Sequence, residues 1–187
     1  MLTKKKLEAI KRIKNEFNDL KDNPDPNVGI SVGLIDENNI FNWKCTLVGP
    51  KDTPYANGIF ILRINFPEDY PEARPEVCFL TPIYHVNVNP RKGLVEGKEG
   101  LGHVCISTLN WWRPNFRIRE VLTNIFGLCY CANPDSPYGI ERAEELRNNK
   151  ELHDKKVRYF TDKYASINVD QSIYENNQEN WDFTYNQ

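Results

Sequence analysis

The stretch of sequence that decides the fold runs from Phe41 to Thr81 and reads FNWKCTLVGPKDTPYANGIFILRINFPEDYPEARPEVCFLT. Within and beside it, residues 40–49 and 58–66 alternate apolar and polar side chains, which is the period of a strand with one buried face. The connecting PKDTPYANG contains the residue types that form turns. A short apolar segment, 76–80, follows a proline-rich run. Consecutive strands with short links predict an antiparallel meander.

Another strand and several helices flank this stretch. Residues 28–35 are rich in β-branched side chains and predict the first of four strands. Upstream, apolar residues recur at intervals of three and four over residues 4–20 and predict an amphipathic helix, which the prolines of KDNPDPN end. Downstream, an irregular region extends to about residue 116. Three predicted helices follow, at 118–132, about 140–149 and 150–165. This order predicts one α+β domain.

Composition and charge exclude several classes of protein. The chain has 187 residues and is 40% hydrophobic, which is enough for one domain with a proper core. A formal net charge of −2 gives no electrostatic reason to expect nucleic acid as a partner. No apolar run reaches the roughly 18 residues that a membrane span needs, and the N-terminus is too polar for a signal peptide. We therefore expect a cytoplasmic or nuclear protein that binds neither nucleic acid nor membrane.

The five cysteines are the first candidates for chemistry. Their odd number, without a secretory signal, predicts reduced thiols. Cys129 and Cys131 are not followed by a second Cys/His pair at zinc spacing, so we expect no metal site. GLVEGKEG, before Cys105, lacks the glycine spacing of a phosphate-binding loop. No protease-type cysteine and histidine context surrounds Cys105. The residues alone leave Cys105 open between a packed small hydrophobe and a nucleophile.

Several ordered motifs, however, match one family. RIKNEFNDLKDNP resembles its first helix, and the opening stretch resembles its sheet and proline-rich turn. IYHVNVN resembles the signature I-Y-H-P-N-I-N, GHVCISTLNWWRP the active-site segment, and REVLTNIFGLCYCANPDSP the helix and acidic turn that follow. From Arg12 to about Ala165 the chain thus resembles the ubiquitin-conjugating enzymes. The resemblance implies that residues 1–166 form a UBC-like domain, with the catalytic loop between the sheet and the last three helices.

The resemblance also implies what the residues of the catalytic loop do. Cys105 would accept the C-terminal glycyl group of ubiquitin from the activating enzyme as a thioester, and would pass it to a lysine of a substrate. Asn87 would donate a hydrogen bond to the oxyanion or support the loop. His85 would be structural, and Tyr84 would line the site.

Further residues are implied in gating and in partner binding. Ser136 and Asp135 would orient the incoming lysine. The basic face of the first helix would meet the activating enzyme, and two further loops would face a ubiquitin ligase. The residues concerned are Lys5, Lys6, Lys11, Arg12 and Lys14 on the helix, and Glu72, Pro114 and Asn115 on the loops. We expect no directly bound cofactor, because ATP is used by the activating enzyme.

The sequence departs from the family pattern in three places, namely Val86, the link between Asn87 and Cys105, and the ligase-facing loops, where WRPNF replaces the common W-S-P-A-L. Val86 replaces the signature proline, and an insertion at about 90–102 lengthens the link between Asn87 and Cys105. Residues 167–187 form an acidic tail rich in Asn and Gln, expected to be flexible, although its aromatic residues would suit a docking segment. CIS and WRP also occur in carriers of SUMO-like modifiers, and AEELRNNKEL is similar to the carrier of NEDD8. The alternatives are therefore the same chemistry with NEDD8 or SUMO, or an inactive ubiquitin-binding variant.

Overall fold

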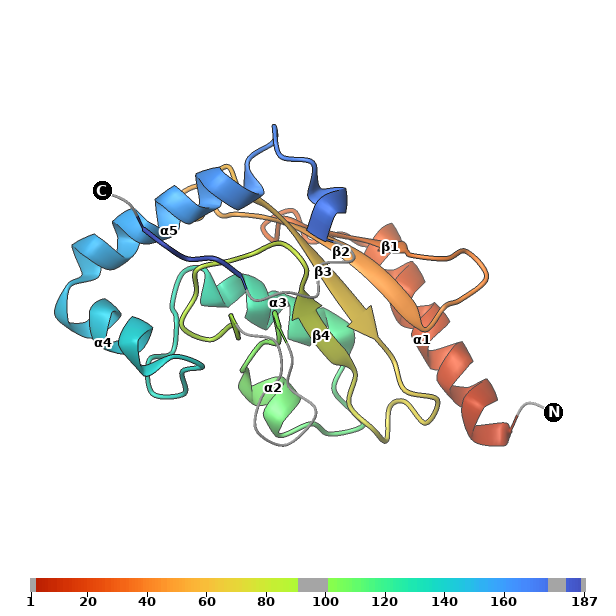
Figure 1. Ribbon diagram of the computed structural model, residues 1–187. Coiled ribbons are helices and arrows are strands. Elements are labelled where there is room, and N and C mark those ends of the chain that lie inside the picture. The colour runs from red at the N-terminus through yellow and green to blue at the C-terminus, as the bar shows by residue number, and fades with distance from the viewer. Residues whose placement is uncertain (1–2, 91–100, 175–180, 186–187) are drawn as a thin grey trace.

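The computed structural model describes residues 3–90, 101–174 and 181–185, and it confirms the predicted α+β architecture (Figure 1). In chain order the elements are α1 (Lys4–Asp22), β1 (Ile30–Leu34), β2 (Asn42–Val48), β3 (Ile59–Asn65), β4 (Glu76–Phe79), α2 (Ser107–Asn110), α3 (Ile118–Leu128), α4 (Ile140–Asn148), α5 (Lys150–Ala165) and a 3₁₀ turn, η1 (Gln171–Tyr174). No helix within the described ranges is long and apolar enough to cross a bilayer.

The four strands form one antiparallel sheet in the order β1-β2-β3-β4. Every second residue of β2 is buried, as the alternation predicts, and each lies opposite a buried residue of β3. These pairs are Trp43 with Ile64, Cys45 with Leu62, and Leu47 with Phe60. One face of the sheet is therefore an apolar surface that other elements must cover.

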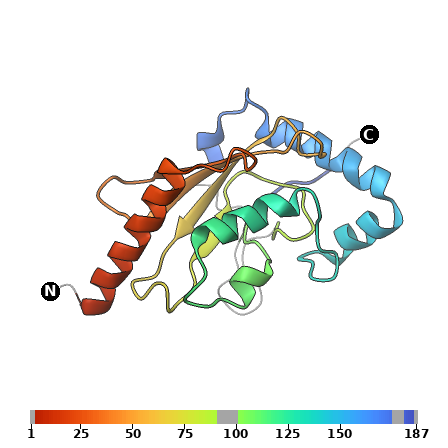
Figure 2. The ribbon, with the colours of Figure 1, turned by 180° about the vertical axis from the view of Figure 1, so that it is seen from behind.

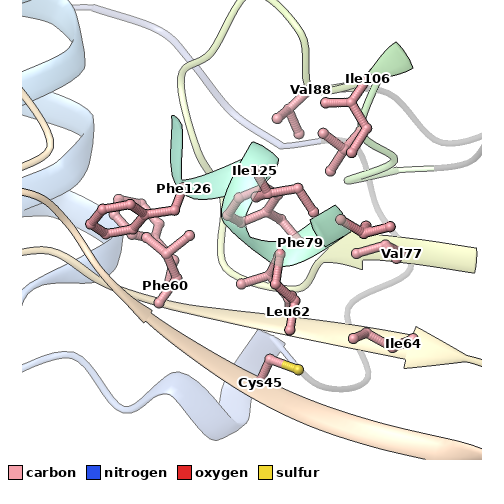
Figure 3. Packing of buried hydrophobic residues seen from close by; sticks show 14 of the residues in the cluster. Cys45, Phe60, Leu62, Ile64, Val77, Phe79, Val88, Ile106, Ile125 and Phe126 are labelled. Carbon is pink, nitrogen blue, oxygen red and sulfur yellow. The ribbon is translucent and has the colours of Figure 1, made fainter. Parts of the chain in front are cut away.

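Helices α1 and α3 cover that apolar surface (Figure 2). Phe17 of α1 packs edge-on against Trp43, with 5.1 Å between ring centroids. Figure 3 shows Phe60 and Leu62 of the sheet beside Ile125 and Phe126 of α3. Because α3 rests directly on the sheet, the segments joined to its two ends are held in a fixed place.

The helices differ from the prediction at two points. The single-turn helix α2 was not predicted, because four residues are too few for an apolar period to show. Helix α3 ends at Leu128 rather than at residue 132. The backbone N–H of Asn133 is donated to Oδ1 of Asn87 at 2.8 Å, so a distant side chain draws the chain out of helical geometry.

The two ends of the insertion meet in a backbone pair. Asn89 N–H is donated to the carbonyl of His103 at 2.9 Å, and Gly102 N–H is donated to the carbonyl of Asn89 at 2.8 Å. Gly102 has φ +78°, and a Cβ there would lie 2.0 Å from the carbonyl oxygen of Phe79, so the position requires glycine. The predicted insertion itself, residues 91–100, lies outside the described residues.

The described residues of the C-terminal tail, 167–174 and 181–185, make several contacts with the domain. Gln171 in η1 accepts a hydrogen bond from Thr81, and Tyr174 is buried. Trp181 is only 7% exposed, and Phe183 packs edge-on against Phe160 of α5 with ring centroids 5.0 Å apart. The composition of the tail favoured disorder, but burial of its aromatic side chains offsets the entropy lost on ordering.

A buried carboxylate joins α1 to the start of α3. Glu16 is 7% exposed, and its Oε2 accepts the N–H of Ile118, the first residue of α3, at 2.7 Å. Its Oε1 accepts from the hydroxyl of Tyr70 at 2.9 Å and from Arg12. The carboxylate thus satisfies an N–H that the helix itself leaves without a partner. Nothing in the sequence pattern marked Glu16.

We expect Glu16→Ala to lower the free energy of unfolding by about 3 kcal/mol, because it leaves a partly buried guanidinium, a buried hydroxyl and a buried amide without their shared acceptor. Urea unfolding at pH 7 measures this. Glu8→Ala is the matched control on the same helix, since Glu8 is exposed and pairs only loosely with Lys4 at 3.9 Å, and we expect it to change stability by less than about 0.5 kcal/mol. A loss below about 1 kcal/mol for Glu16→Ala would contradict the proposed cap.

Candidate active site

Two segments that are distant in the sequence form the site. Val88 and Val104 make an isolated antiparallel bridge, and the N–H of Cys105 is donated to the carbonyl of Asn87 at 2.8 Å. The chain then enters α2, whose buried Leu109 belongs to the core. Backbone pairing of residues 87–88 with residues 104–105 therefore brings the candidate nucleophile and the signature asparagine together, although the insertion separates them in the sequence.

The sulfur of Cys105 lies between two polar side chains. Its Sγ is 3.1 Å from Oγ of Ser136 and accepts a hydrogen bond from Nδ2 of Asn110 at 3.3 Å. Cys105 is partly exposed and borders a groove that extends past Trp111 to Asn124 of α3. The sulfur therefore lies at the edge of this groove, with a hydroxyl and an amide beside it.

Burial distinguishes Cys105 from three of the other cysteines. Cys45, Cys78 and Cys129 are buried. Burial raises the pKa of all three thiols, and that of Cys129 to about 12. These three match the small-hydrophobe interpretation. Cys131, three residues beyond the end of α3, is exposed, so Cys105 is the accessible cysteine whose sulfur contacts both a hydroxyl and an amide.

Asn87 is fully buried, and its carboxamide holds the turn that carries Ser136. Nδ2 donates to the carbonyls of Asn133 at 2.8 Å and of Ser136 at 2.9 Å, while Oδ1 accepts the N–H of Asn133. Both N–H groups of the amide are thus used within the protein. Of the two predicted roles, this geometry favours support of the loop over donation to an oxyanion.

His85 is held as a neutral ring. Its Nδ1 accepts the backbone N–H of Asn87 at 2.9 Å, so the ring proton is on Nε2. This Nε2–H is donated to the carbonyl of Leu128 at 3.1 Å. Burial, with a smaller contribution from the positive charge of Arg142, lowers the pKa of His85 to about 4. With the lone pair of Nδ1 engaged by the N–H of Asn87, the neutral ring is unsuited to act as a base.

Two other predicted site residues lie away from the sulfur. The ring of Tyr84 stacks on Phe160 with centroids 5.3 Å apart, and its hydroxyl is donated to Glu145 at 3.1 Å. It therefore points toward α4 and α5 rather than lining the groove beside Cys105. Asp135 is exposed next to Ser136 and forms an ion pair with Arg147. Its carboxylate lies on the exposed surface of the turn that contains Ser136.

The predicted partner-binding residues differ in how freely they are exposed. Lys6 pairs with Glu68, and Arg12 pairs with the buried Glu16 and donates to the carbonyl of Phe116 at 3.0 Å. These two cations therefore have roles within the fold. The other predicted residues are exposed on the surface, namely Lys5, Lys11, Lys14, Glu72, Pro114 and Asn115.

Three residues of the site region were not predicted from the sequence. Asn110 contacts the sulfur of Cys105, Asn133 contacts Asn87, and Arg142 donates to the carbonyl of His85 at 3.2 Å. Asn133 stands before a proline in the acidic turn, which is a signal for a turn but not for a partner. Asn110 and Arg142 have no local signal, because their contacts depend on how the helices dock. Within the described ranges no group of three or more His, Cys, Asp or Glu is placed to hold a metal ion.

We expect the stability of the protein to fall as the pH drops from 7 to 5, and His85 to cause about 2 kcal/mol of that fall. The pKa of His85 is about 4 in the folded protein against 6.5 for the free group. The unfolded chain therefore binds the proton first as the pH falls below 6.5. Urea unfolding at both pH values should show a smaller decrease in the free energy of unfolding for His85→Gln than for the wild type. Equal decreases in the wild type and in His85→Gln would show that His85 does not titrate in this way.

Comparison with known families agrees with this arrangement. The family model described as ubiquitin-conjugating enzyme matches residues 12–161, which is most of the chain. The match covers the sheet, the segment that contains Asn87, Cys105 in front of α2, and the turn that carries Ser136. The chain belongs to the ubiquitin-conjugating enzyme family.

Proposed function

We propose that Cys105 carries ubiquitin as a thioester, accepted from the ubiquitin-activating enzyme and passed to a lysine of a protein substrate. The observation that carries the proposal is the position of the sulfur. It is accessible at one end of a groove and lies within hydrogen-bond distance of Ser136 and Asn110. Membership of the family supplies the reaction class, with ubiquitin, an activating enzyme and a ligase as general partners.

The proposed chemistry consists of two acyl transfers. The thiolate of Cys105 attacks the thioester carbonyl on the activating enzyme, the new S–C bond forms, and the thiolate of that enzyme leaves. The amine of a lysine then attacks the same carbonyl, the S–C bond breaks, the Cys105 thiolate leaves, and the nitrogen loses a proton. ATP is consumed earlier, by the activating enzyme, so neither transfer at Cys105 needs a cofactor or a metal.

The neighbours of the sulfur suit these steps. The Ser136 hydroxyl and the Asn110 amide would stabilise the thiolate when it attacks and again when it leaves. Asp135, exposed beside Ser136, would attract the lysine ammonium to the turn. Asn87 would keep this turn at a fixed distance from Cys105, because its carboxamide binds both Asn133 and Ser136.

The surfaces proposed for the partners are those left exposed by the fold. Lys5, Lys11 and Lys14 present positive charge to the activating enzyme. Glu72, Pro114 and Asn115 lie on the exposed loops proposed to meet a ligase. The cargo proposed first is ubiquitin, and NEDD8 or SUMO is the alternative with the same chemistry.

The direct test is a charging assay with ATP, ubiquitin and the ubiquitin-activating enzyme, followed by electrophoresis with and without reductant. We expect an adduct on the wild type that reductant removes. Cys105→Ala should form none, and Cys105→Ser should form either none or an oxyester that resists reductant. Cys131→Ser is the matched control, since it replaces the other accessible cysteine, and we expect it to charge like the wild type.

The same assay decides the cargo. Parallel reactions with NEDD8 and SUMO, each with its own activating enzyme, should charge poorly if ubiquitin is the cargo. Charging by NEDD8 alone or SUMO alone would overturn the choice of ubiquitin and keep the reaction. Absence of an adduct with all three modifiers would overturn the enzymatic proposal and favour the inactive variant.

Asn87→Ala distinguishes the two roles considered for this residue. If Asn87 holds the turn, the variant leaves buried amide and carbonyl groups without partners, and we expect the free energy of unfolding to fall by about 2–3 kcal/mol. Discharge of ubiquitin to free lysine should slow as well. Unchanged stability with slow discharge would instead assign the oxyanion role. Urea unfolding and single-turnover discharge of the same preparation provide both values.

A further inference from the structure

A segment of the C-terminal tail, residues 181–185, lies beside α5 and also contacts residues 84–90, which we call the catalytic segment. We call residues 181–185 the strap; it is the dark blue segment that ends near the label C in Figure 1. The backbone N–H of Trp181 is donated to the carbonyl of Pro90 at 3.3 Å. Pro90 is the last described residue before the insertion. The carbonyl of Asp182 accepts a hydrogen bond from the hydroxyl of Tyr164 in α5. The strap is thus attached both to α5 and to the segment that contains Asn87.

The centre of the strap contacts a buried cation. The guanidinium carbon of Arg142 lies 4.5 Å from the ring centroid of Phe183 and 4.4 Å from that of Tyr84. The two rings are themselves packed edge to face, with 5.5 Å between their centroids. Both aromatic faces attract the guanidinium, which is 9% exposed as a residue. Phe183 therefore forms part of the enclosure that fixes the position of Arg142.

Arg142 in turn contacts the catalytic segment. Its Nη1 donates to the carbonyl of His85 at 3.2 Å. Two residues further along, the N–H of Asn87 is donated to the His85 ring, and the carbonyl of Asn87 accepts the N–H of Cys105. The Asn87 carboxamide binds the turn whose Ser136 hydroxyl is 3.1 Å from the sulfur. Continuous contacts thus connect Phe183, through Arg142, to both sides of the reacting atom.

We propose that Arg142 is a positioning residue for transfer from Cys105, and that Phe183 of the strap holds it in place. The inference rests on the proposed function. Without Phe183, one face of the guanidinium is open to water and loses its aromatic partner, so the His85 carbonyl loses a well-placed donor. Small displacements at a reacting centre slow a reaction strongly. The strap therefore affects the chemical step and not the binding of the activating enzyme, whose proposed surface is on α1.

The test compares discharge of ubiquitin from Cys105 to free lysine in single turnovers of the full-length protein. We expect Phe183→Ala to charge fully but to discharge about five- to tenfold more slowly at saturating lysine, with a similar half-saturating lysine concentration. Phe183→Tyr keeps the ring and should restore the rate. Tyr185→Ala is the matched control, because it removes another ring of the same segment, one that packs on Tyr159 and, like Phe183, on Phe160. We expect it to stay within about twofold of the wild type.

A double-mutant cycle tests whether the effect passes through Arg142. If it does, Phe183→Ala should slow discharge by less than about twofold in an Arg142→Gln background. Arg142→Lys serves in its place if the Gln variant does not fold in urea titrations. Full additivity would show that Phe183 acts without Arg142, and an unchanged rate for Phe183→Ala would overturn the inference. A wild type that does not charge at all would refute the proposed function instead, so the two failures are distinguishable.

Discussion

The site depends on one buried carboxamide. Asn87 binds the carbonyls of Asn133 and Ser136 and the N–H of Asn133, and its backbone carbonyl accepts the N–H of Cys105. One residue therefore joins the strand-like catalytic segment, the turn after α3 and the start of α2. The turn carries Ser136, whose hydroxyl lies beside the sulfur, and the chain at α2 carries Cys105 and Asn110. Because Asn87 is fully buried, water does not compete for these bonds, and the relative positions of the groups are kept with little freedom.

Much of the fold could be predicted from local patterns of apolar residues in the sequence. The alternation in 40–49 and 58–66 predicted β2 and β3, since a strand with one buried face imposes its period directly on the sequence. The end of α3 was not predicted, because Asn87, distant in the sequence, takes the N–H of Asn133. The burial of Trp181 and the packing of Phe183 could not be inferred from the composition of the tail, because their partners, among them Phe160 of α5, are not marked in the local sequence.

The site was predictable in part and for a different reason. Cys105 and Asn87 could be named because the motifs around them resemble a family, whereas the residue types alone left Cys105 ambiguous. The structure adds the contacts that no linear motif contains. Asn110 reaches the sulfur from α2, and Arg142 reaches the His85 carbonyl from α4. Such residues are found only when the docking of helices is known, because their partners are distant in the chain.

The backbone pair between Asn89 and Gly102 has a consequence for how this chain tolerates change. The pair closes the insertion at its base, so the backbone on the Cys105 side of Gly102 starts from the same place whatever lies between residues 90 and 101. Lengthening a closed loop twofold costs only about 0.6 kcal/mol. The position is therefore suited to the insertion of a foreign peptide, which would be displayed near Cys105 without changes to the domain that supports it.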